Sequence, residues 1–293
     1  MDRAPINRQR GGVLIAVAGV ILIVALSIFA VAVMRQAERK LDVTKAERVR
    51  LDTLDAVLAQ FVSRHRRLPC PANGGAVSGA LAAGIENING AGQCVPANQS
   101  DGVVPWSTLG LTEQQATNAW GGRISYRVQP SLASNLLNLM NMSWCDPAGL
   151  TTGTPGAANA CLPSPCFSAT CMHPNNYLYG KGLQVQDGAG VWLNRPAPVW
   201  AGAPTPPPLS TGAAYVLISH GANGAGAYNA NGIRQQLPGA GPELSNTAAV
   251  TGATIFIDKA PVDTPGAYFD DVLSHPTLAT VLANAALGPR TPH

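Results

Sequence analysis

The chain has 293 residues, a formal net charge of +3, few aromatic (5%) and few charged (12%) residues, and many glycines (31) and prolines (24). This composition favours short strands, turns and long loops over packed helices. The charge is unevenly divided. Residues 1–67 hold 12 basic and 6 acidic side chains, whereas residues 68–293 hold 7 basic and 10 acidic side chains. The larger part therefore shows no sign of a nucleic-acid-binding surface.

The first predicted element is a long helix. Residues 13–34 carry no charge, and about 20 apolar residues are enough to cross a bilayer as a helix. No proline follows before Pro69, and Leu51, Leu54 and Leu58 recur at helical spacing. The pattern predicts a transmembrane helix over 13–34 that continues as an amphipathic stalk over 35–68.

The N-terminus has three interpretations. A basic stretch followed by an apolar run and the small residues Ala30 and Ala32 is typical of a cleaved secretory signal, which would leave a chain that starts at Val33. A plain membrane anchor is the second interpretation, although basic residues flank both ends of the run, so that charge alone does not orient it.

The third interpretation is a family resemblance. The segment Arg8-Gln9-Arg10-Gly11-Gly12-Val13-Leu14-Ile15 resembles the leader of type IV prepilins and type II secretion pseudopilins. The resemblance implies a leader over 1–12 that a prepilin peptidase removes after Gly11 or Gly12. Members of that family carry a glutamate at the fifth position of the mature helix, where this chain has Ala16 or Val17. The resemblance therefore implies a minor or tip subunit, since the shaft subunits use that glutamate to neutralise a neighbour's terminal amine.

All the cysteines follow the apolar run, as an oxidising compartment beyond a membrane would allow. Their even number permits three disulfides in 15 pairings, and we expect all six to be paired. Cys70 with Cys94 is the favoured bridge, because it closes a Gly/Ala/Asn-rich loop after the helix. The spacing does not favour zinc. The six are Cys70, Cys94, Cys145, Cys161, Cys166 and Cys171.

Residues 69–293 are expected to form one periplasmic head. In it, Trp120-Gly121 followed by Tyr126 on the predicted strand 123–128 resembles the segment that opens the sheet of major pseudopilins. A buried strand is predicted over 214–219, and the glycine-rich loop after it resembles the loop that can hold calcium in pseudopilin heads. That loop has no acidic residue between Ser219 and Leu237, so we do not assign it a metal.

Weaker patterns complete the head. The region of about 143–176 holds four cysteines and several prolines and is interpreted as a disulfide-tied insertion, and residues 195–209 form a proline-rich loop. Further expected elements are a hairpin over 177–185 and 191–193, a strand over 254–258 and a C-terminal helix over 277–287.

The sequence gives little support to an enzyme. Ser219 and His220 are adjacent, which seldom lets a nucleophile and a base face each other, and no nucleophile elbow or phosphate loop occurs. The histidines show no metal-ligand spacing. Asp270 and Asp271 are interpreted as capping or surface residues. We therefore predict a chain without catalytic residues, metal or cofactor, although distant residues can assemble a site that no motif reveals.

The sequence as a whole predicts an α+β protein: a long N-terminal transmembrane-plus-amphipathic helix followed by a loop-rich antiparallel β-sheet head. The expected function is a structural subunit of a type IV pilus or type II secretion pseudopilus, held in the inner membrane with its N-terminus cytoplasmic. The expected partners are other pilin-like subunits, prepilin peptidase and inner-membrane lipids, without nucleic acid. The alternative is a membrane-tethered periplasmic hydrolase or glycan-binding protein. Secretion, adhesion, twitching and DNA uptake all stay open as the process served.

Overall fold

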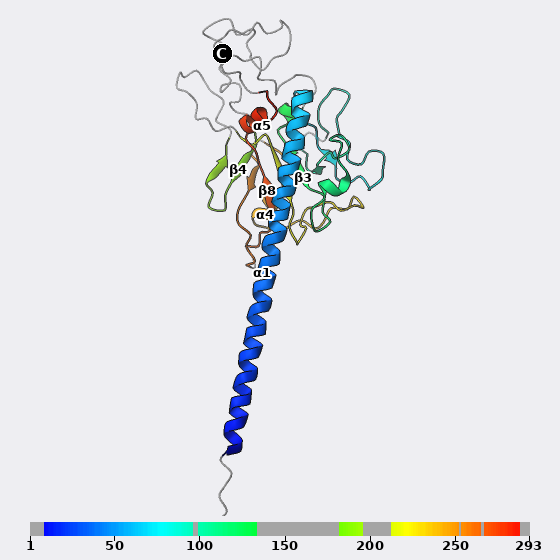
Figure 1. The fold of residues 1–293 in the computed structure, drawn as a ribbon. Helices are drawn as coiled ribbons and strands as arrows, with labels where there is room; N and C mark the ends of the chain where they lie inside the picture. The colour runs from blue at the N-terminus through cyan, green and yellow to red at the C-terminus, as the bar shows by residue number, and fades with distance from the viewer. Residues whose placement is uncertain are drawn as a thin grey trace, which may run out of the picture. The chain divides into compact units, whose positions relative to one another are not determined.

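A computed structural model describes residues 9–95, 99–133, 182–195, 212–251, 253–264 and 267–287, and the fold is described for these (Figure 1). The predicted insertion of 143–176, the first part of the predicted hairpin and almost all of the proline-rich loop lie outside them. The chain divides into two compact units, Met1–Ala46 and Glu47–His293, which are described separately.

Helix α1 runs from Gln9 to His65 and contributes to both units. In the first unit, the large apolar side chains described between residues 22 and 34 are 47–68% exposed. They are Leu22, Ile23, Val24, Leu26, Ile28, Phe29, Val31 and Met34. We call this stretch the exposed apolar segment.

The transmembrane part of the expected fold class is wrong, and with it the predicted single-pass location in the inner membrane. Among the residues that the structure describes, no helix combines the length and the apolar composition that crossing a bilayer requires.

In the second unit, α1 buries one face. Leu51, Leu54, Leu58 and Val62 are each at most 1% exposed, and they share a core with residues of the main sheet and of the C-terminal helix α5 (Leu278–Asn284). This is the face that the helical spacing indicated. The helix ends where Arg66 adopts a left-handed conformation (φ 58°), three residues before Pro69.

The main sheet has the strand order β1-β2-β3-β6-β8, and every pair in it is antiparallel. Strands β3 and β6 lie next to each other within it, and they match the predicted strands of 123–128 and 214–219. The strand bounds are β1 Ala72–Asn73, β2 Gly102–Val103, β3 Ser125–Val128, β6 Tyr215–Ser219 and β8 Val272–Ser274.

Both faces of the main sheet are covered, which the alternating pattern of β3 did not indicate. Tyr126 and Leu217 pack into the core that contains α1, whereas Val216 and Ile218 belong to a second core. That second core includes Phe256, which lies on strand β7 of a smaller sheet with the strand order β5-β4-β7. The bounds of its strands are β4 Gln184–Gln186, β5 Trp192–Asn194 and β7 Ile255–Ile257.

Short helices and one disulfide complete the described fold. Cys70 and Cys94 are bonded, as expected, and close the loop that follows α1. Inside this loop Glu86 accepts hydrogen bonds from both terminal nitrogens of Arg67 (2.8 Å each) and from the backbone N–H of Cys70 (3.0 Å). The short helices are η1 Glu113–Ala116, α2 Pro130–Ala133 and α4 Pro242–Asn246.

Candidate functional site

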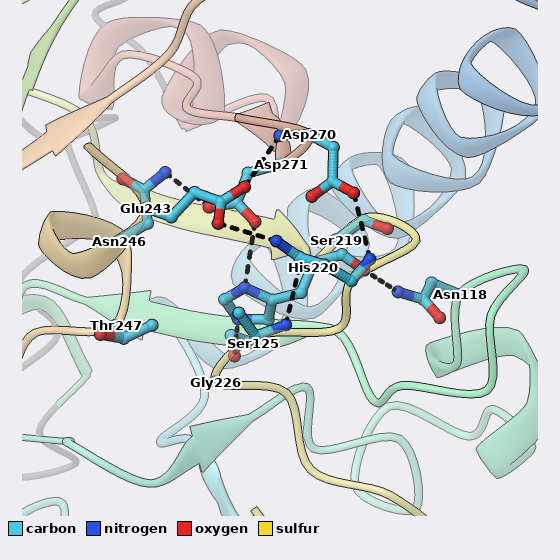
Figure 2. A network of polar contacts seen from close by, with 12 residues as sticks. Asn118, Ser125, Ser219, His220, Gly226, Glu243, Asn246, Thr247, Asp270 and Asp271 are labelled. Carbon is cyan, nitrogen blue, oxygen red and sulfur yellow. Dashed lines mark hydrogen bonds and ion pairs between the residues drawn. The ribbon is translucent and has the colours of Figure 1, made fainter. Parts of the chain in front are cut away.

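Three neighbouring strands bring polar side chains to one place. Ser125 is the first residue of β3, His220 follows the last residue of β6, and Asp271 precedes β8. Ser125 faces Ile218 across the β3–β6 pair, and Ser219 faces Val272 across the β6–β8 pair. The register of the sheet therefore places the serine, the histidine and the aspartate side by side, as Figure 2 shows.

These three side chains form a continuous chain of hydrogen bonds. The Oγ of Ser125 lies 3.0 Å from Nε2 of His220, and Nδ1 of His220 lies 3.2 Å from Oδ1 of Asp271. A nucleophile that contacts a base, which is itself oriented by a carboxylate, is the order found in Ser-His-Asp hydrolases. We call Ser125, His220 and Asp271 the serine–histidine–aspartate chain.

Asn246, the last residue of α4, holds the aspartate by a hydrogen bond. Asn246 donates from Nδ2 to Oδ2 of Asp271 (2.8 Å), and it also bonds the backbone of Ile257 in both directions, donating to its carbonyl (3.0 Å) and accepting from its N–H (2.8 Å). On the other side, Asn118 donates to the backbone carbonyl of His220 (2.6 Å). These contacts fix the Asp271 carboxylate and the backbone at His220, while the imidazole is oriented by its bonds to Ser125 and Asp271.

Two further carboxylates lie beside Asp271. Glu243 and Asp270 offer oxygens that lie, with one of Asp271, within 4.8 Å of one another. Burial raises the pKa of Glu243, and the negative charges of Asp271 and Asp270 add to the rise, against the hydrogen bonds from Asn223 and from the Asp270 N–H. Three such carboxylates could provide hard oxygen ligands for Ca²⁺ or Mg²⁺.

Protein donors already occupy much of this acidic cluster. Asn223 donates its backbone N–H to Oδ2 of Asp270 (3.1 Å) and its side-chain amide to Oε2 of Glu243 (2.9 Å). Tyr268 also donates to Oδ2 of Asp270 (2.7 Å). The cluster thus holds the glycine-rich loop after β6 through the two hydrogen bonds of Asn223, whereas the buried Oδ1 of Asp270 has no hydrogen-bond partner among the described residues.

A cavity of about 260 Å³ lies next to the serine–histidine–aspartate chain. His220 forms part of its wall, together with residues of the glycine-rich loop such as Asn223 and Gly224. Its remaining wall is mostly amide side chains and glycines, with one aromatic ring: Asn118, Trp120, Gly121, Gly122, Ala222, Ala227, Asn229 and Gln235. Ser125 does not line this cavity, and both Ser125 and His220 are 1% exposed.

Ser219 and His220 are adjacent in the sequence, but their side chains have different partners. Ser219 donates to the buried carboxylate of Glu47 on α1 (2.8 Å), whereas the partner of His220 is Ser125, 95 residues away. Asp270 and Asp271, expected at the surface or as caps, lie instead in the acidic cluster. Ser125, Glu243 and Asn246 carried no motif, and only the topology of the sheet could have identified them.

The side-chain oxygens of Asn223 and Asn229 accept hydrogen bonds from the backbone of the glycine-rich loop itself. Oδ1 of Asn223 accepts from the N–H of Ala225, and Oδ1 of Asn229 accepts from the N–H groups of Asn231 and Ile233. These are the short turns that asparagine favours. Any cation near this loop would depend on carboxylates from positions 243, 270 and 271, which are far away in the sequence.

Other predicted site residues lie away from this network or outside the described residues. Gly11 and Gly12 fall within the first turns of α1, which begins at Gln9. Cys145, Cys161, Cys166 and Cys171 lie outside the described residues, so their expected pairing stays a prediction.

Comparison with known proteins gave no match to a family model, to a curated protein or to a solved structure.

Proposed function

We propose that this chain is a minor or tip subunit of a pilin-like filament, either a type IV pilus or a type II secretion pseudopilus. The observation that carries the proposal is the exposed apolar segment of α1. Ile28 and Phe29 are 66% and 68% exposed, and Leu22, Ile23, Leu26 and Met34 are similarly uncovered. A helix that is apolar all round is normally buried, so these side chains require a partner surface.

Equivalent helices of neighbouring subunits fit this requirement. Packing apolar helices side by side would remove their side chains from water and stabilise the assembly by about 25 cal/mol for each Å² of apolar surface buried. The sequence that precedes the segment supports the same proposal, because Gly11 and Gly12 follow a basic leader. The compact unit of residues 47–293 would then be the part that the filament presents.

The absence of a carboxylate from residues 13–34 supports a minor position. In the family that the leader resembles, a glutamate in this segment neutralises the terminal amine of the adjacent subunit. A buried amine without such a partner is costly. This chain should therefore occupy few positions in a filament made mainly of another subunit.

Affinity purification of the full chain from its native cells tests the proposal. We expect other pilin-like subunits to copurify in excess over the tagged chain. Ile28→Asp should reduce their recovery at least tenfold, because it places a charge in the packed surface. Leu81→Asp is the matched control, since Leu81 is 97% exposed in a loop of the other unit, and this variant should leave recovery unchanged.

Two outcomes would contradict the proposal. One is a purified chain without any pilin-like partner, and the other is an Ile28→Asp variant that recovers as much partner as the unmodified chain.

A hydrolase is the second candidate function, and the geometry of Ser125, His220 and Asp271 is the specific observation that favours it.

A further inference from the structure

We propose that the unit formed by residues 47–293 holds an esterase site, in which Ser125 is the nucleophile, His220 the general base and Asp271 the group that orients the base. The proposed substrates are short acyl esters of hydroxyl-rich alcohols, such as acetyl esters of carbohydrates. This activity is additional to a role in a filament, and it is tested independently of that role.

The first argument is the geometry of the hydrogen bonds. His220 uses its two ring nitrogens for two different partners, Ser125 Oγ at 3.0 Å and Asp271 Oδ1 at 3.2 Å. The pairing with a carboxylate favours the tautomer that carries hydrogen on Nδ1 and leaves Nε2 to accept the serine proton. Asn246 completes the arrangement by holding Oδ2 of Asp271.

The second argument is the rigidity of the support. Ser125 lies on β3 inside the main sheet, and the other two members flank strands β6 and β8, which pair with each other. Strands position side chains more precisely than loops do, and precise placement is what nucleophilic catalysis requires. A polar chain of this kind is also buried, so it cannot be explained as a solvated surface cluster.

The third argument is the adjacent cavity, which indicates the substrate class. The Gln235 amide can both donate and accept hydrogen bonds, as recognition of hydroxyl groups requires, and Trp120 offers an aromatic face. The Asn229 side chain can only donate, from Nδ2, because its Oδ1 already accepts from the N–H groups of Asn231 and Ile233. The volume of about 260 Å³ fits a short acyl chain on a small polar alcohol. Lipid-like esters are disfavoured by this wall.

Access to Ser125 requires movement of the glycine-rich loop, because His220 reaches the cavity wall while Ser125 does not. Gly224 and Gly226 have positive φ values (61° and 84°), and Asn223 ties the loop to the acidic cluster through Asp270 and Glu243. Loss of the Asn223 side chain would remove its hydrogen bonds with Glu243 and with the Ala225 N–H, and would loosen the part of the loop that borders the cavity, although the backbone bond from Asn223 to Asp270 would stay. In the proposed site, this loop therefore has to move before a substrate can reach Ser125.

The reaction follows from these roles. Ser125 Oγ attacks the ester carbonyl carbon while His220 Nε2 takes its proton, the bond to the alcohol oxygen breaks, and the protonated imidazole gives its proton to that alcohol. Water then attacks the acyl group on Ser125 through the same base, which releases the carboxylic acid and restores the serine. The net reaction is ester plus water to acid plus alcohol.

Labelling of the full chain with a fluorophosphonate probe tests the proposal, with the adduct mapped by peptide mass spectrometry. We expect a single adduct on Ser125, formed at least threefold faster in Asn223→Ala, where the loop is released. Hydrolysis of p-nitrophenyl acetate should fall at least 100-fold in Ser125→Ala. Ser219→Ala is the matched control, because Ser219 is an adjacent buried serine that contacts Glu47 instead of the histidine.

The proposal is overturned if neither the unmodified chain nor Asn223→Ala forms an adduct on Ser125, or if the adduct forms on Ser219. Mapping the adduct on unmodified protein makes this result independent of whether Ser125→Ala folds. Recovery of filament partners by the same preparation is a separate readout, so a failure of the esterase leaves the proposed filament role untouched.

Discussion

Replacing Asp55 by asparagine should stabilise the folded chain at neutral pH. Asp55 lies on α1 facing the main sheet, where it accepts hydrogen bonds from Tyr215 (2.8 Å) and Ser274 (2.5 Å). Burial raises its pKa to about 6 from 3.8, against the effect of these two hydrogen bonds, and Asp52 adds a smaller rise. The folded state therefore holds a proton that the unfolded state has lost across the window from about pH 4 to pH 6.

The sign of the pH effect follows from this difference. Protonated Asp55 stabilises the fold fully below about pH 4, and this stabilisation is lost as the pH rises through about 6. The shift corresponds to about 2 kcal/mol after allowance for partial solvent exposure. An asparagine side chain at this position cannot ionise and can still bond both hydroxyls. Asp55→Asn should therefore gain roughly 1–2 kcal/mol at pH 7.5 and little at pH 4.

Urea unfolding at both pH values, monitored by circular dichroism, measures this difference. Asp52→Asn is the matched control, because Asp52 is one turn away on the same helix but exposed, and it should change the free energy of unfolding by less than about 0.5 kcal/mol. A lower stability of Asp55→Asn at pH 7.5 would contradict this expectation, because it would mean that the ionised carboxylate stabilises the contact between α1 and the sheet.

Removal of the Cys70–Cys94 disulfide should cost about 3–4 kcal/mol of stability. The two cysteines are 24 residues apart, and cross-linking a loop of this size lowers the entropy of the unfolded chain by a corresponding amount. Cys70 is fully buried and Cys94 nearly so, which makes the bond part of the core that contains α1. The double variant Cys70→Ser, Cys94→Ser should therefore unfold at a clearly lower urea concentration.

The free energy of unfolding from urea titration, together with a thiol count under denaturing conditions, measures this effect. Leu81→Ser provides the control, since it lies in the same loop but is 97% exposed, and it should change stability by less than about 0.5 kcal/mol. A loss below about 1 kcal/mol in the double variant would mean that the loop is held by its packing and by the Arg67–Glu86 pair instead.

Local patterns in the sequence were sufficient for much of the described fold. The spacing of Leu51, Leu54 and Leu58 identified the buried face of α1, because a helix repeats every 3.6 residues. The apolar run before Ser219 identified β6, and a loop rich in small residues indicated the Cys70–Cys94 pair. Each of these features depends on residues that are close in sequence or on composition alone.

The candidate site could not be predicted in this way, because its members are distant. Ser125 and His220 are 95 residues apart, and His220 and Asp271 are 51 apart. Only the strand order β3-β6-β8 brings them together, and no local pattern contains that order. The alternation in β3 identified the face of Tyr126, but it did not reveal that the face of Ser125 and Arg127 is buried as well.

The transmembrane expectation depended on the composition of residues 13–34 alone. Among the described residues, no helix has the length and apolar composition of a membrane span. Ile28 and Phe29 are exposed, so this surface has no partner among the described residues. Which surface covers it is the central question of the proposed function.

The N-terminal sequence of the protein isolated from its native cells tests that function most directly. A pilin-like subunit predicts a mature chain that begins at Gly12 or Val13, and a double variant Gly11→Ala, Gly12→Ala that keeps its full length. A mature chain that begins at Val33 would indicate ordinary signal cleavage, and one that still begins at Met1 would show that no leader is removed. Either of these two results would contradict the filament role.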